Sequence, residues 1–115
     1  MLQFFDWFVV TKSVFPLVEC HNSFIANTRE AVKLHNKGVK IIIGLGHSGY
    51  EKDIEIAQKV PFIDAVVGGH THSFLYPDGQ ENPSNNIVEG PYPTIVTKDN
   101  GKSAAVVQAM IVYLG

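Results

Sequence analysis

Short apolar runs that end at glycine alternate with amphipathic stretches in the middle of this 115-residue chain. The β-branched run at residues 39–43 is too short for a helix and ends at Gly44, and the run at residues 62–67 ends at Gly68 and Gly69. Runs of this length and composition are typical of strands buried on both faces of a sheet. The sequence therefore predicts two buried strands, each followed by a glycine turn.

The stretches beside these runs predict two helices. The tetrapeptide at residues 27–30, Asn-Thr-Arg-Glu, resembles a capping box, and the amphipathic stretch after it ends at Gly38. Residues 48–51, Ser-Gly-Tyr-Glu, are a second capping box, and the helix that they open ends at Pro61. Strand, helix and strand in this order form a βαβ unit with parallel strands. Both glycine turns then lie at the carboxyl edge of the sheet, where open α/β sheets bind ligands.

The last third of the chain predicts a loop and a hairpin. Residues 77–93 are polar and rich in Pro, Asn and Gly, which indicates one long surface loop. Strand-like runs flank the sequence Asp-Asn-Gly at residues 99–101, a strong signal for a β-hairpin turn. The predicted fold class is thus α/β, with a βαβ unit and a terminal β-hairpin.

Composition and charge exclude several classes of function. The chain is 45% hydrophobic and 17% charged, as in a globular domain. Its net charge is −2, and its lysines and arginines are scattered singly along the sequence. No basic face follows a phosphate backbone, so we expect no nucleic-acid partner. Cys20 is the one cysteine, which excludes an internal disulfide and a Cys-x-x-Cys motif. Asp6 and Lys12 interrupt the apolar N-terminal stretch, so we expect neither a working signal peptide nor a membrane span.

Three of the five histidines lie at the two glycine turns. His47 follows the first apolar run, and His70 and His72 follow the second. Because both turns share one edge of the sheet, the imidazoles can meet, and residues 70 and 72 of an extended segment point to one side. Neutral imidazole is a preferred ligand of borderline divalent metals, so the three histidines predict a metal site. The glycines that would shape the turns and aim the histidines are Gly46, Gly49, Gly68 and Gly69.

Other interpretations of these residues are weaker. The stretch "GLGHSG" fits the dinucleotide pattern G-x-G-x-x-G, and Asp64 follows its first glycine by twenty residues. Asp64 begins its strand, however, and would point to the wrong edge of the sheet for a ribose contact. Ser48 fits a helix cap better than a catalytic nucleophile. Asp53 and Glu55 stand near two lysines on the second helix, which indicates a solvated helix face.

The segments "IIIGLGHSGYEKDIEIAQKVPFIDAVVGGHTHSFLY", "GPYPTIVT" and "VVQA" resemble the 5′-nucleotidase family of calcineurin-like dinuclear metallophosphoesterases. The likeness is greatest to its animal ecto-5′-nucleotidase and apyrase branch and runs from about residue 32 to residue 115. The resemblance implies the C-terminal part of a four-layer αββα sandwich. In this interpretation residues 24–115 are a partial metallophosphoesterase domain, and residues 1–23 are an atypical N-terminal segment.

The resemblance also implies an activity, the hydrolysis of nucleoside 5′-monophosphates by two divalent metal ions, commonly zinc or else manganese. His47 and His70 match ligands of one metal, and His72 matches a ligand of the other, where the branch often has Asn or Gln. Two cations roughly 3.5–4 Å apart neutralise an anionic phosphomonoester and activate a water molecule. The substrate would be a nucleotide and the location extracellular or at the cell surface, and the oligomeric state stays open.

The family's other site motifs, D-x-H, a G-D pair and G-N-H-[DE], do not occur in this sequence. Neither Asp53 on its helix nor Asp64 at a strand start is placed to bridge two metals. We therefore expect a fragment of a metal-dependent 5′-nucleotidase-type phosphohydrolase that is inactive alone and binds one metal ion or none. Two alternatives stay open: a non-catalytic metal- or nucleotide-binding truncated paralogue, and a chain whose unpaired sheet edges prevent independent folding.

Overall fold

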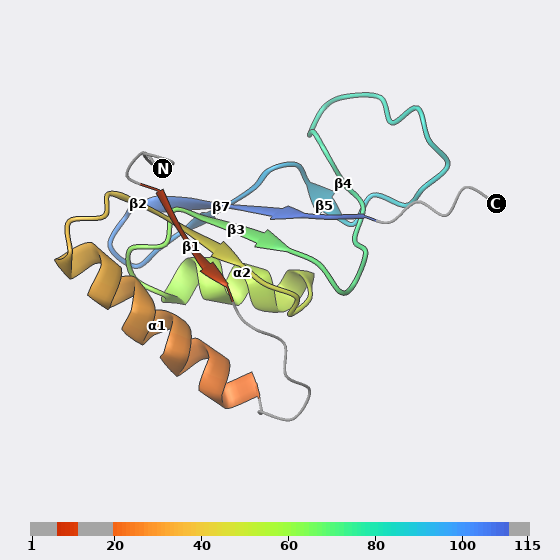
Figure 1. Ribbon diagram of the computed structural model, residues 1–115. Coiled ribbons are helices and arrows are strands. Elements are labelled where there is room, and N and C mark those ends of the chain that lie inside the picture. Colours follow the sequence, from red (N-terminus) through yellow and green to blue (C-terminus); the bar gives the residue numbers. More distant parts are fainter. Residues whose placement is uncertain (1–6, 12–19, 111–115) are drawn as a thin grey trace, which may run out of the picture.

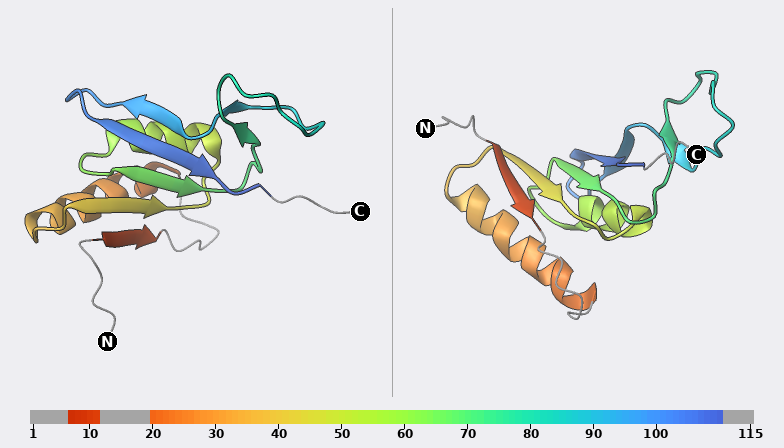
Figure 2. Two further views of the ribbon diagram at one scale, coloured as in Figure 1. Left: turned by 90° about the horizontal axis from the view of Figure 1, so that it is seen from above. Right: turned by 45° about the vertical axis from the view of Figure 1, so that its right-hand side comes forward.

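A computed structural model describes residues 7–11 and 20–110, with side chains from residue 24 onward. These residues form the predicted mixed α/β fold, in which two helices cover the same face of a five-stranded sheet (Figures 1 and 2). The strand order is β1-β2-β3-β7-β6. The bounds of these strands are β1 (Trp7–Thr11), β2 (Ile41–Leu45), β3 (Ala65–Gly68), β7 (Ser103–Gln108) and β6 (Thr94–Thr97).

The predicted βαβ unit is confirmed. Helix α2 (Tyr50–Lys59) connects β2 to β3, which pair in parallel with Leu45 opposite Val67. Both strands begin later than predicted, for reasons in the backbone. The Val39 N–H donates to the Leu34 carbonyl at 3.1 Å and so belongs to the end of the preceding helix. Phe62 has a φ of 65°, which lies outside the extended region that a strand requires.

Helix α1 (Cys20–Asn36) is longer than predicted, and the capping box expected at its start is wrong. Asn27 and Thr28 lie inside the helix, where the buried Thr28 Oγ1 has no hydrogen-bond partner. The predicted end of this helix is confirmed. Gly38 has a φ of 88°, and its N–H donates to the His35 carbonyl at 2.9 Å, a typical glycine termination.

The predicted hairpin is also confirmed, because β6 and β7 pair antiparallel around a turn at Gly101, which has a φ of 79°. The residues of the long loop are mostly exposed, as expected. Two short strands lie at its ends and pair in parallel, β4 (Leu75–Tyr76) and β5 (Gly90–Pro91). The loop extends from the carboxyl edge of the large sheet, beyond the ends of β2 and β3 (Figure 1).

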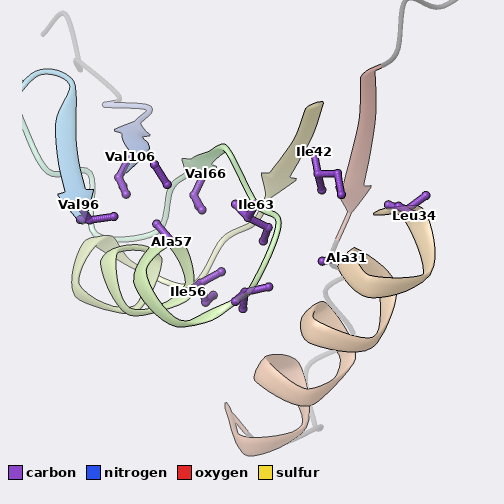
Figure 3. Close-up of a cluster of buried hydrophobic side chains, with 11 residues drawn as sticks. Ala31, Leu34, Ile42, Ile56, Ala57, Ile63, Val66, Val96 and Val106 are labelled. Atoms are coloured by element: carbon purple, nitrogen blue, oxygen red, sulfur yellow. The ribbon is translucent and has the colours of Figure 1, made fainter. Parts of the chain in front are cut away.

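The core lies between the sheet and the two helices. Ile42, Val66 and Val106 project from β2, β3 and β7 toward this layer (Figure 3). Their neighbours Ile43 and Val67 face the other side and are only half-buried. The prediction that both faces of these strands are buried is therefore not met in the described part of the chain. One layer of helices and the five-stranded sheet pack against each other there, beside the small β4-β5 sheet.

The N-terminal segment is described only in part. Residues 1–6 and 12–19, where much of the expected atypical segment falls, lie outside the described residues. Residues 7–11 form β1, which pairs in parallel with β2 and which the sequence patterns did not predict. Over the described ranges 7–11 and 20–110, neither helix has the length and apolar character needed to cross a membrane.

Candidate metal site

The two glycine turns are hydrogen-bonded to each other at the carboxyl edge of the sheet. The Gly46 N–H donates to the Val67 carbonyl at 3.0 Å, and the Gly49 N–H donates to the Gly69 carbonyl at 3.1 Å. Since β2 and β3 pair in parallel up to Leu45 and Val67, both chains leave the sheet at the same place. The predicted meeting of the two turns is confirmed.

This arrangement brings two exposed imidazoles together. The rings of His47 and His70 have their centroids 5.3 Å apart and meet edge to face, with 71° between their planes. A Cβ at Gly69 would lie 3.0 Å from His47 Nδ1, tighter than most real contacts of a Cβ. Glycine at position 69 therefore allows the His47 ring to lie against the backbone beside His70.

His72 does not join this pair. Among residues 24–110, no group of three or more His, Cys, Asp or Glu side chains could hold a metal ion. The backbone gives the reason, because His70 and His72 have φ values of 84° and 54°. The segment is therefore not extended, so the premise on which residues 70 and 72 were expected to point to one side is not met. Two left-handed residues other than glycine in one loop are costly and typical of functional sites.

Three of the four turn glycines are required by the local packing. Gly49 has a φ of 96°, a conformation that other residues rarely adopt. A Cβ at Gly68 would overlap the carboxylate of Asp53, and one at Gly69 would press on His47. Gly46 differs, since the nearest atom to a Cβ there is Ser48 Oγ at an ordinary 3.8 Å.

The second predicted capping box is wrong, although the helix that follows it is present. Gly49 occupies the N-cap position of α2 without a side-chain hydrogen bond, and the buried Ser48 Oγ has no hydrogen-bond partner. The Tyr50 N–H instead donates to Thr71 Oγ1 at 3.1 Å. Thr71 belongs to residues 69–73, the histidine loop, and its hydroxyl thus accepts from an N–H at the start of α2 that has no partner within the helix. No local sequence pattern could reveal this contact.

Asp53 is a buried residue that the sequence interpretation placed wrongly in solvent. Its side chain is fully buried beneath Gly68, and its Oδ2 accepts a hydrogen bond from Gln108 Nε2 at 3.3 Å. A signal was available, because Asp53 lies on the same stripe of α2 as the buried Ile56 and Ala57. The interpretation is right for Glu55, which two lysines on the helix surface contact.

Electrostatic effects near this helix are local. Hydrogen bonds from Lys52 and Lys59 hold the pKa of Glu55 at about 2, below its ordinary value of 4.5.

Asp64 lies at the opposite, amino edge of the sheet, where its Oδ2 accepts a hydrogen bond from the Ile42 N–H at 2.8 Å. Its location agrees with the sequence analysis, which excluded Asp64 from the carboxyl edge.

The pair of imidazoles fits part of a metal site. His47 and His70 are exposed, lie side by side and are held by turns that are bonded to each other. A catalytic zinc ion usually takes three protein ligands and keeps one position open. Two imidazoles are fewer than these three, so the pair would need at least one further ligand to make such a site.

Comparisons with known proteins place the chain in a family. No family model matches it. A snake venom 5′-nucleotidase from Naja atra is 44% identical over 102 residues, which are 87% of this chain and 19% of that protein. A 5′-nucleotidase from Rattus norvegicus is 51% identical over 88 residues, which are 75% of this chain and 15% of the relative. The chain thus spans less than a fifth of the length of these relatives.

Two solved structures agree with the sequence comparisons. A crystal structure of a 5′-nucleotidase precursor from Thermus thermophilus has a TM-score of 0.66 and 34% identity over 75% of this chain and 16% of its own. The NAD nucleotidase of Haemophilus influenzae has a TM-score of 0.66 and 35% identity over 74% of this chain and 15% of its own. Sequence and fold lead to the same conclusion: the chain belongs to the 5′-nucleotidase family and matches one segment of its members.

Proposed function

We propose that this chain supplies part of the metal site of a phosphohydrolase that converts nucleoside 5′-monophosphates to nucleoside and phosphate. The observation that carries the proposal is the pairing of His47 with His70 on two hydrogen-bonded turns. This pairing occurs in a chain that is 51% identical to a named 5′-nucleotidase over 88 residues. We also propose that the protein acts outside the cell or at its surface, which its similarity to a snake venom 5′-nucleotidase supports.

His47 and His70 would hold one divalent cation, zinc or manganese, as imidazole ligands. His72, exposed two residues further along the same loop, would offer a ligand to a second cation. Bound cations supply charge neutralisation to an anionic phosphomonoester and activate water. The chain's own contribution is to fix the two imidazoles at one sheet edge through the bond between the Gly49 N–H and the Gly69 carbonyl.

We further propose that the 115-residue chain does not turn over a nucleotide by itself. A bridging carboxylate is needed between two metals, and the two aspartates weighed for this role, one on α2 and one just before β3, have other partners. Asp53 lies beneath Gly68 and binds Gln108, while Asp64 binds the Ile42 amide at the opposite edge. Binding of a cation and turnover are therefore separate properties of this chain and are tested separately.

Titration of the metal-free chain with zinc or manganese, followed by calorimetry, tests the ligand assignment. We expect His47→Ala and His70→Ala each to weaken metal binding by at least about tenfold. Even the loss of a residue that only hydrogen-bonds to a metal ligand has an effect of this size. His35→Ala is the matched control, because His35 stacks on Phe62 at the amino edge with ring centroids 3.8 Å apart. Unchanged affinity in both site variants would refute the assignment.

Phosphate release from AMP tests the activity. We expect none from the chain with added zinc, and turnover like that of a complete 5′-nucleotidase would contradict the proposal. A chimera in which residues 41–108 replace the aligned segment of the rat relative supplies the remaining ligands. We expect this chimera to release phosphate and to lose the activity with His47→Ala, but to keep it with His35→Ala. An inactive, folded chimera would count against the proposed role of the segment.

A further inference from the structure

The side chain of Gln108 bonds to both ends of the histidine loop. Its Oε1 accepts hydrogen bonds from the Ser73 N–H and from Thr71 Oγ1, both at 2.8 Å. Its Nε2 donates to the Gly69 carbonyl at 3.0 Å and to Asp53 Oδ2 at 3.3 Å. One planar amide thus joins the first and last residues of the loop 69–73 and touches its middle.

The partners determine the orientation of this amide. Two acceptors, the Gly69 carbonyl and the Asp53 carboxylate, lie at the nitrogen, and two donors lie at the oxygen. Thr71 Oγ1 already accepts from the Tyr50 N–H, so its own proton is available for Gln108 Oε1. A rotated amide would lose the bonds to the Ser73 N–H, the Gly69 carbonyl and the Asp53 carboxylate. Glutamate would lack the two donors, and asparagine would be too short by one methylene group.

The backbone of Gln108 gives this contact a rigid base. Gln108 is the last residue of β7 and pairs with Gly68 of β3. The Ala109 N–H also donates to the Gly68 carbonyl at 3.1 Å. The loop follows β3, and Gln108 ends β7, which is paired with β3. The side chain of Gln108 therefore holds the loop from a neighbouring strand of the same sheet.

The loop needs such a restraint, because His70 and His72 both occupy the left-handed region, at φ values of 84° and 54°. Each such conformation is costly for a residue with a side chain and persists only where the surroundings enforce it. The bonds at the Gly69 carbonyl and the Ser73 N–H enclose these two residues from either side. The loop cannot relax without breaking at least one of them.

We propose that Gln108 is the positioning residue of the site: its amide closes the loop 69–73, enforces the left-handed backbone at His70 and His72, and so places His70 beside His47. The effect on metal binding rests on the proposed function. The effect on the loop does not, because it concerns the metal-free chain.

Solution NMR of the metal-free 115-residue chain tests the effect on the loop. In Gln108→Leu we expect the Ser73 amide to exchange at least roughly tenfold faster, because its buried hydrogen bond is lost. We also expect the HN–Hα couplings of His70 and His72 to leave the left-handed range, and the contact signals between the His47 and His70 rings to vanish. Gln58→Leu is the matched control, since Gln58 is exposed on α2, and it should change none of these signals.

Two further measurements separate positioning from general stability. Core amide protection at Ile42 reports on the whole fold and should be unchanged in Gln108→Leu. Should that variant unfold, Gln108→Met, which keeps the length of the side chain and adds no charge beside Asp53, should loosen the loop alone. Wild-type values of the His70 and His72 couplings in a Gln108 variant would overturn the proposal, as would equal loss of protection at Ser73 and Ile42 in both variants.

Zinc titration then connects the loop to the proposed function. We expect Gln108→Leu to weaken zinc binding by about tenfold or more, as loss of a supporting residue does at other metal sites. If the wild-type chain binds no zinc while Gln108→Leu still releases the loop, the proposed metal site fails and the positioning role stands. If the wild-type chain binds zinc and Gln108→Leu binds it equally well with an unchanged loop, the positioning role fails.

Discussion

The end of helix α2 depends on a buried lysine. Lys98, directly after β6, is only 7% exposed, and its Nζ donates to the Ala57 carbonyl at 2.7 Å and to the Val60 carbonyl at 2.6 Å. Ala57 lies in the last turn of α2 and Val60 is its C-cap, a region where carbonyls lack helical N–H partners. The ammonium also lies at the negative end of the helix dipole. Lys98 thus caps the C-terminal end of α2, the helix that lies between the two histidine turns along the chain.

The substitution Lys98→Met keeps most of the apolar stem and removes the ammonium. Each charge-assisted hydrogen bond contributes about 1.5–3 kcal/mol, so the two bonds set an upper limit of about 6 kcal/mol. Burial lowers the pKa of Lys98, although the nearby Asp64 raises it. Removal of a buried charge is therefore favourable in itself and offsets part of the stability lost with the two hydrogen bonds. We expect a net decrease in the free energy of unfolding of about 2–4 kcal/mol.

Urea unfolding followed by circular dichroism measures this loss at neutral pH and again in alkaline buffer. The folded-state pKa of Lys98 lies below the ordinary value of 10.5, so the unfolded chain binds more protons between the two values. Wild-type stability therefore gains a contribution as pH rises through this window, and Lys98→Met lacks it. The difference between the two proteins should grow toward pH 10.5.

The exposed Lys102 of the same hairpin provides the control, and Lys102→Met should change the stability by less than about 1 kcal/mol at either pH. The reasoning is refuted if Lys98→Met is as stable as the wild type at neutral pH. It is also refuted if the difference between the two proteins shrinks as the pH rises, because the sign of the linkage would then be wrong.

Two further predictions concern the helix that carries Asp53. Gly68→Ala places a methyl group on the Asp53 carboxylate and should lower the free energy of unfolding by about 1–3 kcal/mol, as overpacking does. Gly44→Ala, whose Cβ would meet Ile63 Cδ1 at 3.6 Å, should be better tolerated in the same urea assay, and equal losses would contradict the packing argument. The stabilisation from ionised Glu55 should be lost as pH falls from 4.5 to about 2, because its folded pKa is lowered. Glu55→Gln should flatten the acid dependence of the melting temperature, and an unchanged slope would exclude this ion pair as its cause.

The elements that the sequence predicts well depend on local patterns. The strand predicted in the run 39–43, the glycine at 38 and the turn at residues 99–101 are governed by nearby residues, and the structure has a strand, a helix end and a hairpin turn there. The strand starts were misplaced because tertiary contacts override the local pattern. Val39 completes the end of α1, and the left-handed Phe62 stacks its ring on His35. A β-branched or aromatic residue at these positions has strand propensity that the surroundings overrule.

The parts of the site that were missed are interactions between segments far apart in the sequence. Thr71 binds the start of α2 across 21 positions, and Gln108 reaches Asp53 across 55 positions. Ser48 has the residue type of a helix cap, and only the left-handed Gly49 explains why its hydroxyl does not cap α2. Residue types alone thus identified the paired histidines but could not identify the groups that hold them.

The chemistry of the pair depends on charge as well as on position. Two neutral imidazoles can bind a divalent cation but cannot neutralise it, so a hydrolytic site needs carboxylates beside them. Among the described side chains, Asp53 binds Gln108 and Glu55 contacts two lysines, while Asp64 binds the Ile42 amide at the opposite edge of the sheet. Freeing Asp53 would expose a charge beneath Gly68 and remove one partner of the amide that closes the histidine loop. The Gln108 contact that we propose to position His70 thus also holds the Asp53 carboxylate beneath Gly68.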